Sequence, residues 1–276
     1  MTTYQVDVSP KTSLEHMLSG EHEMFPVREI VASRAFVRGM VASQRNNKAL
    51  DAESLLEQDF CTLLEFDSRV RRYGMQPFTI RWTDANGARR QYTPDVLVHY
   101  DLMLRPGEVR QRPTVYEVKH SEDLRENWVT YRPKFKAAIA ALRPLGLTFK
   151  IITEKQIRTP RLKNASFLLQ YATPRLSSPE PAENEMKFVL RRRLFVLKVS
   201  TPRELLASIS SSTAVQARYL PWLWHLIAYG LAGCDLDKPL NMSSPVWTFD
   251  DERSVRSNGM QHFPQPWPKL LKSARV

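Results

Sequence analysis

Cysteine is scarce in this sequence, and its scarcity excludes two common ways of building a fold or a site. The chain of 276 residues contains only two cysteines, Cys61 and Cys234, which lie far apart, each in an apolar context. Two isolated cysteines support neither a disulfide framework nor a zinc cluster, so we expect buried thiols in a reducing compartment. The six histidines show no ligand spacing, which argues against a histidine metal site.

Long hydrophobic runs are also missing. No apolar stretch is long enough to span a bilayer, and the N-terminal sequence MTTYQVDVSPKTSLEHML has no signal-peptide core. We therefore expect an intracellular protein without a membrane partner. Acidic residues are the minority charge, with 29 Asp and Glu against 40 Lys and Arg, a net charge of +11 and a pI of about 9.8. This excess favours a polyanionic partner such as nucleic acid, although charge alone identifies none.

The segment 92–119 carries the strongest functional pattern in the chain. After Pro94 the run DVLVHY alternates as a β-strand does, with Asp95 at the strand entrance. The run TVYEVK alternates in the same way, so Glu117 and Lys119 point to the same side of a second strand. The pattern predicts a carboxylate at one strand entrance, followed by a carboxylate and a lysine on the next strand.

These residue types in this order suit metal-assisted hydrolysis of a phosphodiester. Two carboxylates and a backbone carbonyl are hard oxygen ligands for Mg²⁺, which keeps waters for the substrate and the nucleophile. The lysine adds a charge that holds the attacking water or stabilises the developing phosphorane. A structural alternative stays open, in which Asp95 is a turn residue after Pro94 and Glu117 and Lys119 are an exposed pair.

An amphipathic helix is predicted in the run DAESLLEQDFCTLLEFD. Its apolar residues recur at helical spacing, at Leu56, Phe60, Leu63 and Leu64. Glu53 and Glu57 lie one turn apart, and Glu57 borders the apolar stripe. Glu57 could therefore complete a metal shell beside the two strands. The alternative is that the glutamates of this helix are surface acids.

The remaining patterns predict an α/β arrangement for this part of the chain. Further strand patterns occur at 78–82, 89–92 and 148–153. Asn86-Gly87 is a hairpin turn signal between the first two. A polar turn after the strand that carries Glu117 leads to a helix that starts near Pro133. A last helix has its inner face at 162–171. We expect a mixed sheet flanked by helices, with the carboxylates where the central strands meet.

The segments SLLEQDF, LLEFD, QPFTI, YTPDVLV and YEVK, followed by TFKIITE and NASFLLQYA, resemble the TnsA family of endonucleases. These proteins are subunits of heteromeric cut-and-paste bacterial transposases and carry a restriction-endonuclease-like PD-(D/E)XK domain. The resemblance covers roughly 49–172 and is specific as a set, although PD and ExK alone occur in many nucleases. It implies a catalytic set of Glu57, Asp95, Glu117 and Lys119. Glu57 matches the family glutamate through its setting Ser54-Leu-Leu-Glu57.

The resemblance also implies a mechanism. Mg²⁺, or Mn²⁺ in its place, is expected to bind to Asp95, Glu117 and the Val118 carbonyl, with Glu57 reaching it directly or through water. Lys119 would orient the attacking water. The family nicks the strand at the 5′ ends of the transposon, whereas a separate TnsB-like integrase cuts and joins the 3′ ends.

The partners that the resemblance implies are DNA at the transposon ends, a TnsB-like integrase and a TnsC-like AAA+ ATPase. The C-terminal domain is expected to contact the ATPase, and the bacterial cytoplasm is the expected location. Without its partners the endonuclease is expected to be inactive or weak.

The composition divides the chain into five expected parts. The Pro- and Ser-rich sequence TPRLSSPEPAEN predicts a linker at 173–184. Before it we expect an arm at 1–48, which contains Arg28, Arg34, Arg38, Arg45 and Lys48, and the PD-(D/E)XK endonuclease domain at 49–172. After it we expect a smaller winged-helix-like domain at 185–249 and a basic, Pro-rich tail at 250–276.

Two other functions remain open at this stage. A stand-alone PD-(D/E)XK nuclease of the restriction or repair type would cleave DNA without partners. A non-catalytic assembly or DNA-binding protein would keep the fold alone, and the intact set Glu57, Asp95, Glu117 and Lys119 argues against it.

Overall fold

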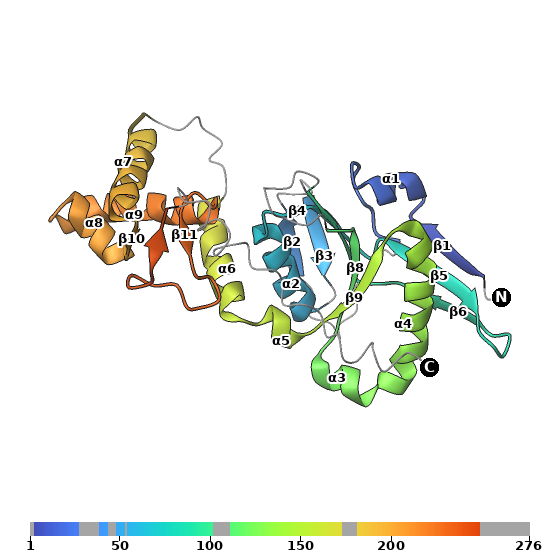
Figure 1. Cartoon of the computed structure of the whole chain (residues 1–276). Helices are drawn as coiled ribbons and strands as arrows, with labels where there is room; N and C mark the ends of the chain where they lie inside the picture. The colour runs from blue at the N-terminus through green and yellow to red at the C-terminus, as the bar shows by residue number, and fades with distance from the viewer. Residues whose placement is uncertain are drawn as a thin grey trace. The chain divides into compact units, whose positions relative to one another are not determined.

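The computed structural model describes residues 3–27, 39–43, 48–52, 54–101, 111–172 and 181–248. The chain forms two compact units that divide after Ile157 (Figure 1). Within the described residues, no helix has the length and apolarity needed to cross a bilayer.

The first unit is built around a four-stranded mixed sheet in the order β4-β7-β8-β9. Its strands are β4 (Val70–Met75), β7 (Val96–Tyr100), β8 (Thr114–Val118) and β9 (Thr148–Ile152). The pairs β4 with β7 and β7 with β8 are antiparallel, and β8 with β9 is parallel. Every residue of the two central strands is buried, as expected for a sheet covered on both faces. The predicted mixed α/β fold is confirmed.

A second sheet has the order β1-β5-β6. It contains β1 (Tyr4–Val8), β5 (Phe78–Thr83) and β6 (Arg89–Tyr92), and the last two form the predicted hairpin. The turn needs glycine at Gly87, because its φ of 77° lies in the left-handed region. A separate antiparallel pair joins β2 (Gly39–Ser43) and β3 (Lys48–Ala52).

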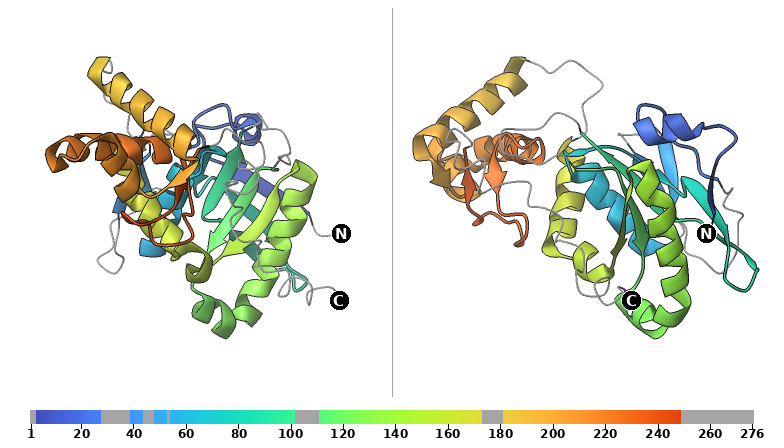
Figure 2. Two further views of the ribbon diagram at one scale, coloured as in Figure 1. Left: turned by 60° about the vertical axis from the view of Figure 1, so that its left-hand side comes forward. Right: turned by 45° about the vertical axis from the view of Figure 1, so that its right-hand side comes forward.

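Two helices cover opposite faces of the four-stranded sheet (Figure 2). They are α2 (Leu55–Phe66), which begins and ends close to the predicted bounds, and α4 (Trp128–Leu142). Leu97 of β7 and Val115 of β8 belong to the same buried cluster as Phe135 of α4. On the other face Phe60 of α2 meets Tyr116 of β8, with ring centroids 5.1 Å apart. Because side chains alternate along a strand, the odd-numbered residues of β7 and β8 face α4.

Helix α3 (Ser121–Glu126) occupies the segment where the sequence predicted a polar turn. Helix α4 follows at once, so Pro133 lies inside it rather than near its start. A proline in the second turn removes one backbone hydrogen bond, and the packing of Phe135, Ala138 and Leu142 against the sheet offsets that loss. A short 3-10 turn, η1 (Arg143–Leu145), and Gly146 end this segment, and α5 (Glu154–Ile157) follows β9.

The expectation of an N-terminal arm is wrong where the structure describes it. Strand β1 pairs with β5 along its whole length, and α1 (Leu14–Ser19) follows it. Tyr4, Val6 and Val8 pack against the core, and Asp7 Oδ2 accepts a 2.6 Å bond from Arg81 Nε. The start of the chain is therefore part of the first unit. The arginines 28, 34, 38 and 45 of the expected arm lie outside the described residues.

In its described residues, the second unit combines four helices with a three-stranded sheet in the order β10-β12-β11. The elements are α6 (Pro160–Ala172), α7 (Pro181–Leu197), β10 (Val199–Ser200), α8 (Pro202–Ile209), α9 (Thr213–Ala228), β11 (Gly233–Cys234) and β12 (Val246–Trp247). Helix α8 begins with a capping box between Thr201 and Glu204.

The division between the units differs from the expected boundary at residue 172. Helix α6 lies in the second unit, where its buried Asn164 bonds to residues far along the chain. Asn164 Nδ2 donates to the carbonyls of Leu236 and Lys238 at 2.8 and 2.7 Å, and its Oδ1 accepts from the Leu240 N–H at 3.1 Å. Helix α7 begins within the expected linker 173–184. Residues 173–180 and the tail 250–276 lie outside the described residues.

Candidate active site

The register of the central strands brings Asp95 and Glu117 together. Val96 pairs with Tyr116 and Leu97 with Val115, so one further step puts Asp95 opposite Glu117. Asp95 immediately precedes β7, and its Oδ2 accepts a 2.7 Å hydrogen bond from the Val118 N–H. The Asp95 carbonyl accepts another from the Gln76 N–H, also at 2.7 Å. The Asp95 side chain is therefore fixed at the meeting point of two strands, as the sequence predicted.

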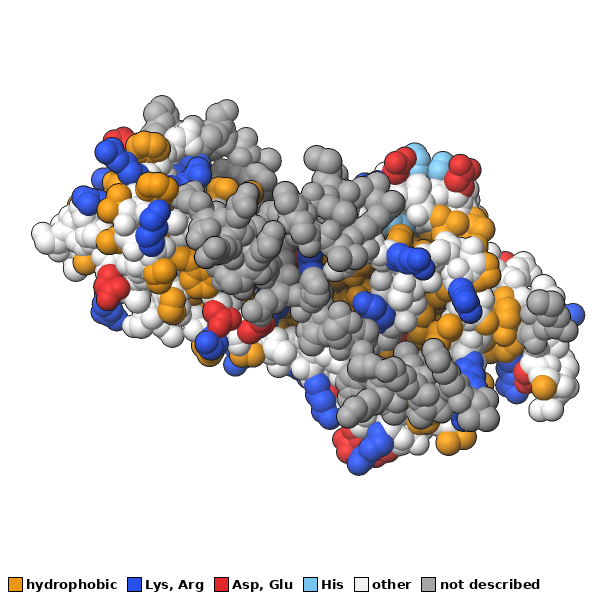
Figure 3. Space-filling view, in the orientation of Figure 1, with side chains coloured by type: hydrophobic (Ala, Val, Ile, Leu, Met, Phe, Trp, Pro, Cys, Tyr) orange, Lys and Arg blue, Asp and Glu red, His pale blue; other side chains and the backbone are white. Residues whose placement is uncertain are grey.

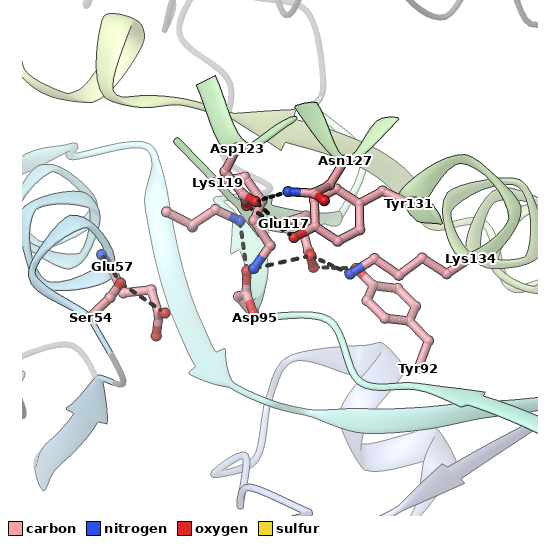
Figure 4. A network of polar contacts seen from close by, with 11 residues as sticks. Ser54, Glu57, Tyr92, Asp95, Glu117, Lys119, Asp123, Asn127, Tyr131 and Lys134 are labelled. Carbon is pink, nitrogen blue, oxygen red and sulfur yellow. Dashed lines mark hydrogen bonds and ion pairs between the residues drawn. The ribbon is translucent and has the colours of Figure 1, made fainter. Parts of the chain in front are cut away.

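Glu117 is the most buried carboxylate of this group, with 1% of the residue exposed. Its Oε1 lies 3.0 Å from Lys134 Nζ and 3.7 Å from Lys119 Nζ. Its Oε2 accepts a 2.5 Å hydrogen bond from the Tyr92 hydroxyl. Burial of a carboxylate is costly unless the charge is paired, and here two ammonium groups and one hydroxyl pair it (Figure 4).

The charges of the site shift the pKa values of its members. Burial raises the pKa of Asp95, and the negative charges of Glu117 and Glu57 raise it further against the opposing effect of Lys119 and the Val118 N–H. Burial alone would lower the pKa of Lys119, but the carboxylates of Glu117 and Asp95 outweigh it and raise that pKa. Lys119 is therefore a charged ammonium at neutral pH, and the Asp95 carboxylate lies near other negative charges.

Glu57 stands apart from this pair. It lies in the first turn of α2, where the Ser54 hydroxyl accepts from its N–H at 3.2 Å and donates to its Oε1 at 3.0 Å. Figure 4 shows its carboxylate beside Ser54 and away from Asp95 and Glu117. Glu57 is nevertheless buried, with 8% of the residue exposed, and its charge acts on Asp95. The structure thus brings Asp95, Glu117 and Lys119 together, whereas Glu57 remains at the helix N-terminus.

Two residues beside Glu117 were missed by the sequence patterns. Tyr92 ends β6, three positions before Asp95, and Lys134 lies one and a half turns into α4. The alternation of the segment 92–119 could have drawn attention to Tyr92. Lys134 has no such signal, because its place at the site depends on which helix covers this face of the sheet.

A second layer of hydrogen bonds supports the α4 side of the site. The Tyr131 hydroxyl lies 3.0 Å from each oxygen of the Asp123 carboxylate, and Asn127 Nδ2 donates to Asp123 Oδ1 at 2.8 Å. These bonds join α3 to α4, and the Tyr131 ring lies 4.5 Å from Lys134 Nζ. The first turns of α4 are thereby held in place beside Glu117 (Figure 4).

The donor set suits a divalent cation. Asp95 and Glu117 offer carboxylate oxygens, which are the hard ligands that Mg²⁺ prefers. Burial, and then the negative charges of Glu117 and Glu57, raise the pKa of Asp95, and a bound cation would offset this penalty on its ionised form. In the part of the chain that the structure describes, no three His, Cys, Asp or Glu side chains lie close enough together to hold an ion. Coordination by a third carboxylate would require Glu57 to turn away from Ser54.

Two carboxylates and a lysine thus lie at adjoining strand ends of a mixed sheet, in the sequences Pro94-Asp95 and Glu117-Val118-Lys119. This arrangement is similar to that expected of a PD-(D/E)XK nuclease. The comparison with protein families agrees. Residues 67–154 match the family described as TnsA-like endonuclease N terminal, so the chain carries a TnsA-like endonuclease domain. The matched segment includes Asp95, Glu117 and Lys119 and begins after Glu57. A comparison with curated proteins finds no match.

Proposed function

We propose that this protein is the endonuclease subunit of a cut-and-paste transposase and that it hydrolyses the non-transferred strand at the 5′ ends of the transposon during excision. The observation that carries the proposal is the meeting of Asp95, Glu117 and Lys119 at the ends of the two central strands inside the TnsA-like segment. The fold alone would not support it, because one fold hosts many functions.

The proposed roles follow from charge and position. Asp95 and Glu117, with the Val118 carbonyl, would hold Mg²⁺ or Mn²⁺, and Glu57 would join them after leaving Ser54. A bound divalent cation supplies Lewis-acid activation of the scissile phosphate and of water. Lys119 orients the attacking water and offsets the charge that develops on the phosphate. Its place beside Glu117 Oε1 and its raised pKa support this role, since it stays charged at neutral pH.

DNA at the transposon ends is the proposed substrate. The net charge of +11 favours a polyanion. On the face that Figure 3 shows, Lys and Arg side chains are scattered over the described surface rather than gathered in one stripe. Such a distribution supplies general attraction to the DNA backbone, so we propose that a TnsB-like integrase provides the recognition of the end sequence.

We propose that the second unit contains a winged helix that contacts a TnsC-like AAA+ ATPase. The chain order is helix, strand, helix, helix, strand, strand from α7 to β12, and the strands form one small antiparallel sheet. Phe188 and Val196 of α7 are 63% and 68% exposed, and Arg191 to Arg193 are exposed beside them. Exposed apolar side chains close in sequence to basic ones on one helix support contact with a protein rather than base readout alone.

Strand-specific mapping of cuts tests the proposal. A DNA substrate carrying both transposon ends is incubated with Mg²⁺ and either wild type or Asp95→Ala, with and without the integrase and ATPase partners. We expect 5′-end cuts only with the partners, and we expect Asp95→Ala to abolish them while the 3′ cuts remain. If the wild type cleaves unaided at sites unrelated to the ends, the protein is a stand-alone restriction or repair nuclease and the transposase assignment is wrong.

A further inference from the structure

Lys134 is the closest cation to the proposed metal ligand Glu117. Its Nζ lies 3.0 Å from Glu117 Oε1, whereas Lys119 Nζ lies 3.7 Å from the same oxygen. The two lysines approach the carboxylate from opposite sides, Lys119 from the end of β8 and Lys134 from α4 (Figure 4). Because the Tyr92 hydroxyl occupies Oε2, both oxygens of Glu117 already have partners.

The Lys134 ammonium is held by more than this ion pair. It lies 5.0, 4.5 and 5.1 Å from the ring centroids of Tyr92, Tyr131 and Phe135. A cation within about 6 Å of an aromatic face is attracted by the ring quadrupole, and three such faces surround this one. Only 25% of the Lys134 side chain is exposed. It is therefore a positioned cation and not a solvated surface lysine.

A divalent cation that binds to Glu117 must compete with this arrangement. The ion needs a carboxylate oxygen, and Oε1 is shared by two ammonium groups while Oε2 accepts from Tyr92. Lys119 belongs to the ExK motif and has its own role beside the reacting phosphate. Lys134 has no such role, and its flexible four-carbon stem allows the ammonium to withdraw toward solvent.

We propose that Lys134 is a positioning residue of the active site: its ammonium holds the Glu117 carboxylate in the metal-free protein and is exchanged for the divalent cation when the cation binds. This inference rests on the proposed function. It implies that Lys134 keeps a buried carboxylate charged and correctly oriented at a cost in cation affinity. The nuclease domain would thus remain folded in the metal-free state and bind its cation only weakly.

Titration of the metal-free full-length protein with Mn²⁺ tests this exchange, with free Mn²⁺ measured by electron paramagnetic resonance. We expect Lys134→Met to lower the Mn²⁺ dissociation constant about tenfold, because it removes a positive charge beside the ligand. Lys134→Arg, which keeps the charge, should remain close to wild type. Lys136→Met is the matched control, since Lys136 lies on the same helix and is exposed. It should leave the affinity unchanged.

A stability measurement separates exchange from a purely structural role. Lys134→Met should lower the melting temperature in EDTA, because Glu117 loses its nearest counter-ion. Added Mn²⁺ should raise the melting temperature of Lys134→Met by more than it raises that of wild type, because tighter binding stabilises the folded state more. An equal Mn²⁺-induced rise in both proteins would mean that Lys134 is structural only, and the inference would be wrong.

The outcomes also separate this inference from the proposed function. If wild type binds Mn²⁺, Asp95→Asn abolishes binding and Lys134→Met has wild-type affinity, the metal site stands and the exchange is wrong. If wild type binds no Mn²⁺ at this site, both the exchange and the proposed metal-dependent function are wrong.

Discussion

The hydrogen bond from Tyr92 to Glu117 provides a direct test of the site geometry. Tyr92→Phe removes only the hydroxyl, because the ring keeps its contacts with Phe135 and Phe149, at centroid distances of 6.3 and 6.4 Å. A hydrogen bond to a charged group contributes about 1.5–3 kcal/mol to stability. Both lysines remain beside the Glu117 carboxylate in the variant. We therefore expect the free energy of unfolding to fall by about 1.5–2 kcal/mol, near the lower end of that range.

The assay is equilibrium unfolding in EDTA, by urea at neutral pH and by heat. For a unit of this size the expected loss corresponds to a melting temperature lower by about 3–8 °C. Tyr100→Phe is the matched control, because its hydroxyl meets the neutral hydroxyl of Tyr116 at 2.8 Å in the same buried sheet. A neutral hydrogen bond contributes about 0.5–1.5 kcal/mol, so this control should lose less. If Tyr92→Phe is as stable as wild type, the Tyr92 hydroxyl does not support Glu117 and the described geometry is wrong.

Three further predictions concern charge, capping and the second unit. Asp95→Asn should stabilise the metal-free protein at pH 7.5, because the pKa of Asp95 is raised on folding and its ionisation therefore destabilises the folded state. The gain in unfolding free energy, measured with urea, should shrink as the pH falls toward the unfolded pKa of about 3.9. A gain that grows in acid would contradict this. Ser54→Ala should cost about 1 kcal/mol of unfolding free energy through the lost N-cap of α2, and an unchanged urea midpoint would contradict the bonds to Glu57. Asn164→Ala should speed amide hydrogen exchange at Leu240, whose N–H it leaves without its acceptor, and unchanged exchange there would refute the packing of α6 in the second unit.

The sequence was informative about Asp95, Glu117 and Lys119 because strand periodicity is local. Alternation assigns each side chain to a face, and antiparallel pairing then leaves few ways to combine two short strands when one starts after Asp95 and the other carries Glu117 near its end. The same reasoning predicted the hairpin before Asp95 and the helix that carries Glu57. What it could not predict is the orientation of the Glu57 side chain, which binds to Ser54 instead of approaching Asp95.

Features that depend on contacts between distant segments were not predicted. Lys134 reaches Glu117 only because α4 covers one face of the sheet, and no pattern within α4 indicates this. The place of α6 depends in the same way on Asn164, whose partners lie more than seventy residues away. The strand at Tyr4–Val8 was missed although its residues alternate, because five residues with few strongly apolar side chains give only a weak strand signal. The strand is stabilised by its pairing with β5, which the local sequence does not show.

The measurement that tests the central claim most directly follows the oxygen of the attacking water. The 5′-end cut is carried out with both partners and Mg²⁺ in ¹⁸O-enriched water, and the phosphate at the cut is analysed by mass spectrometry. Hydrolysis by a water held beside Asp95, Glu117 and Lys119 predicts one ¹⁸O atom in that phosphate for wild type and no cut for Asp95→Asn. Cutting that persists in Asp95→Asn, or a phosphate without the label, would contradict the account.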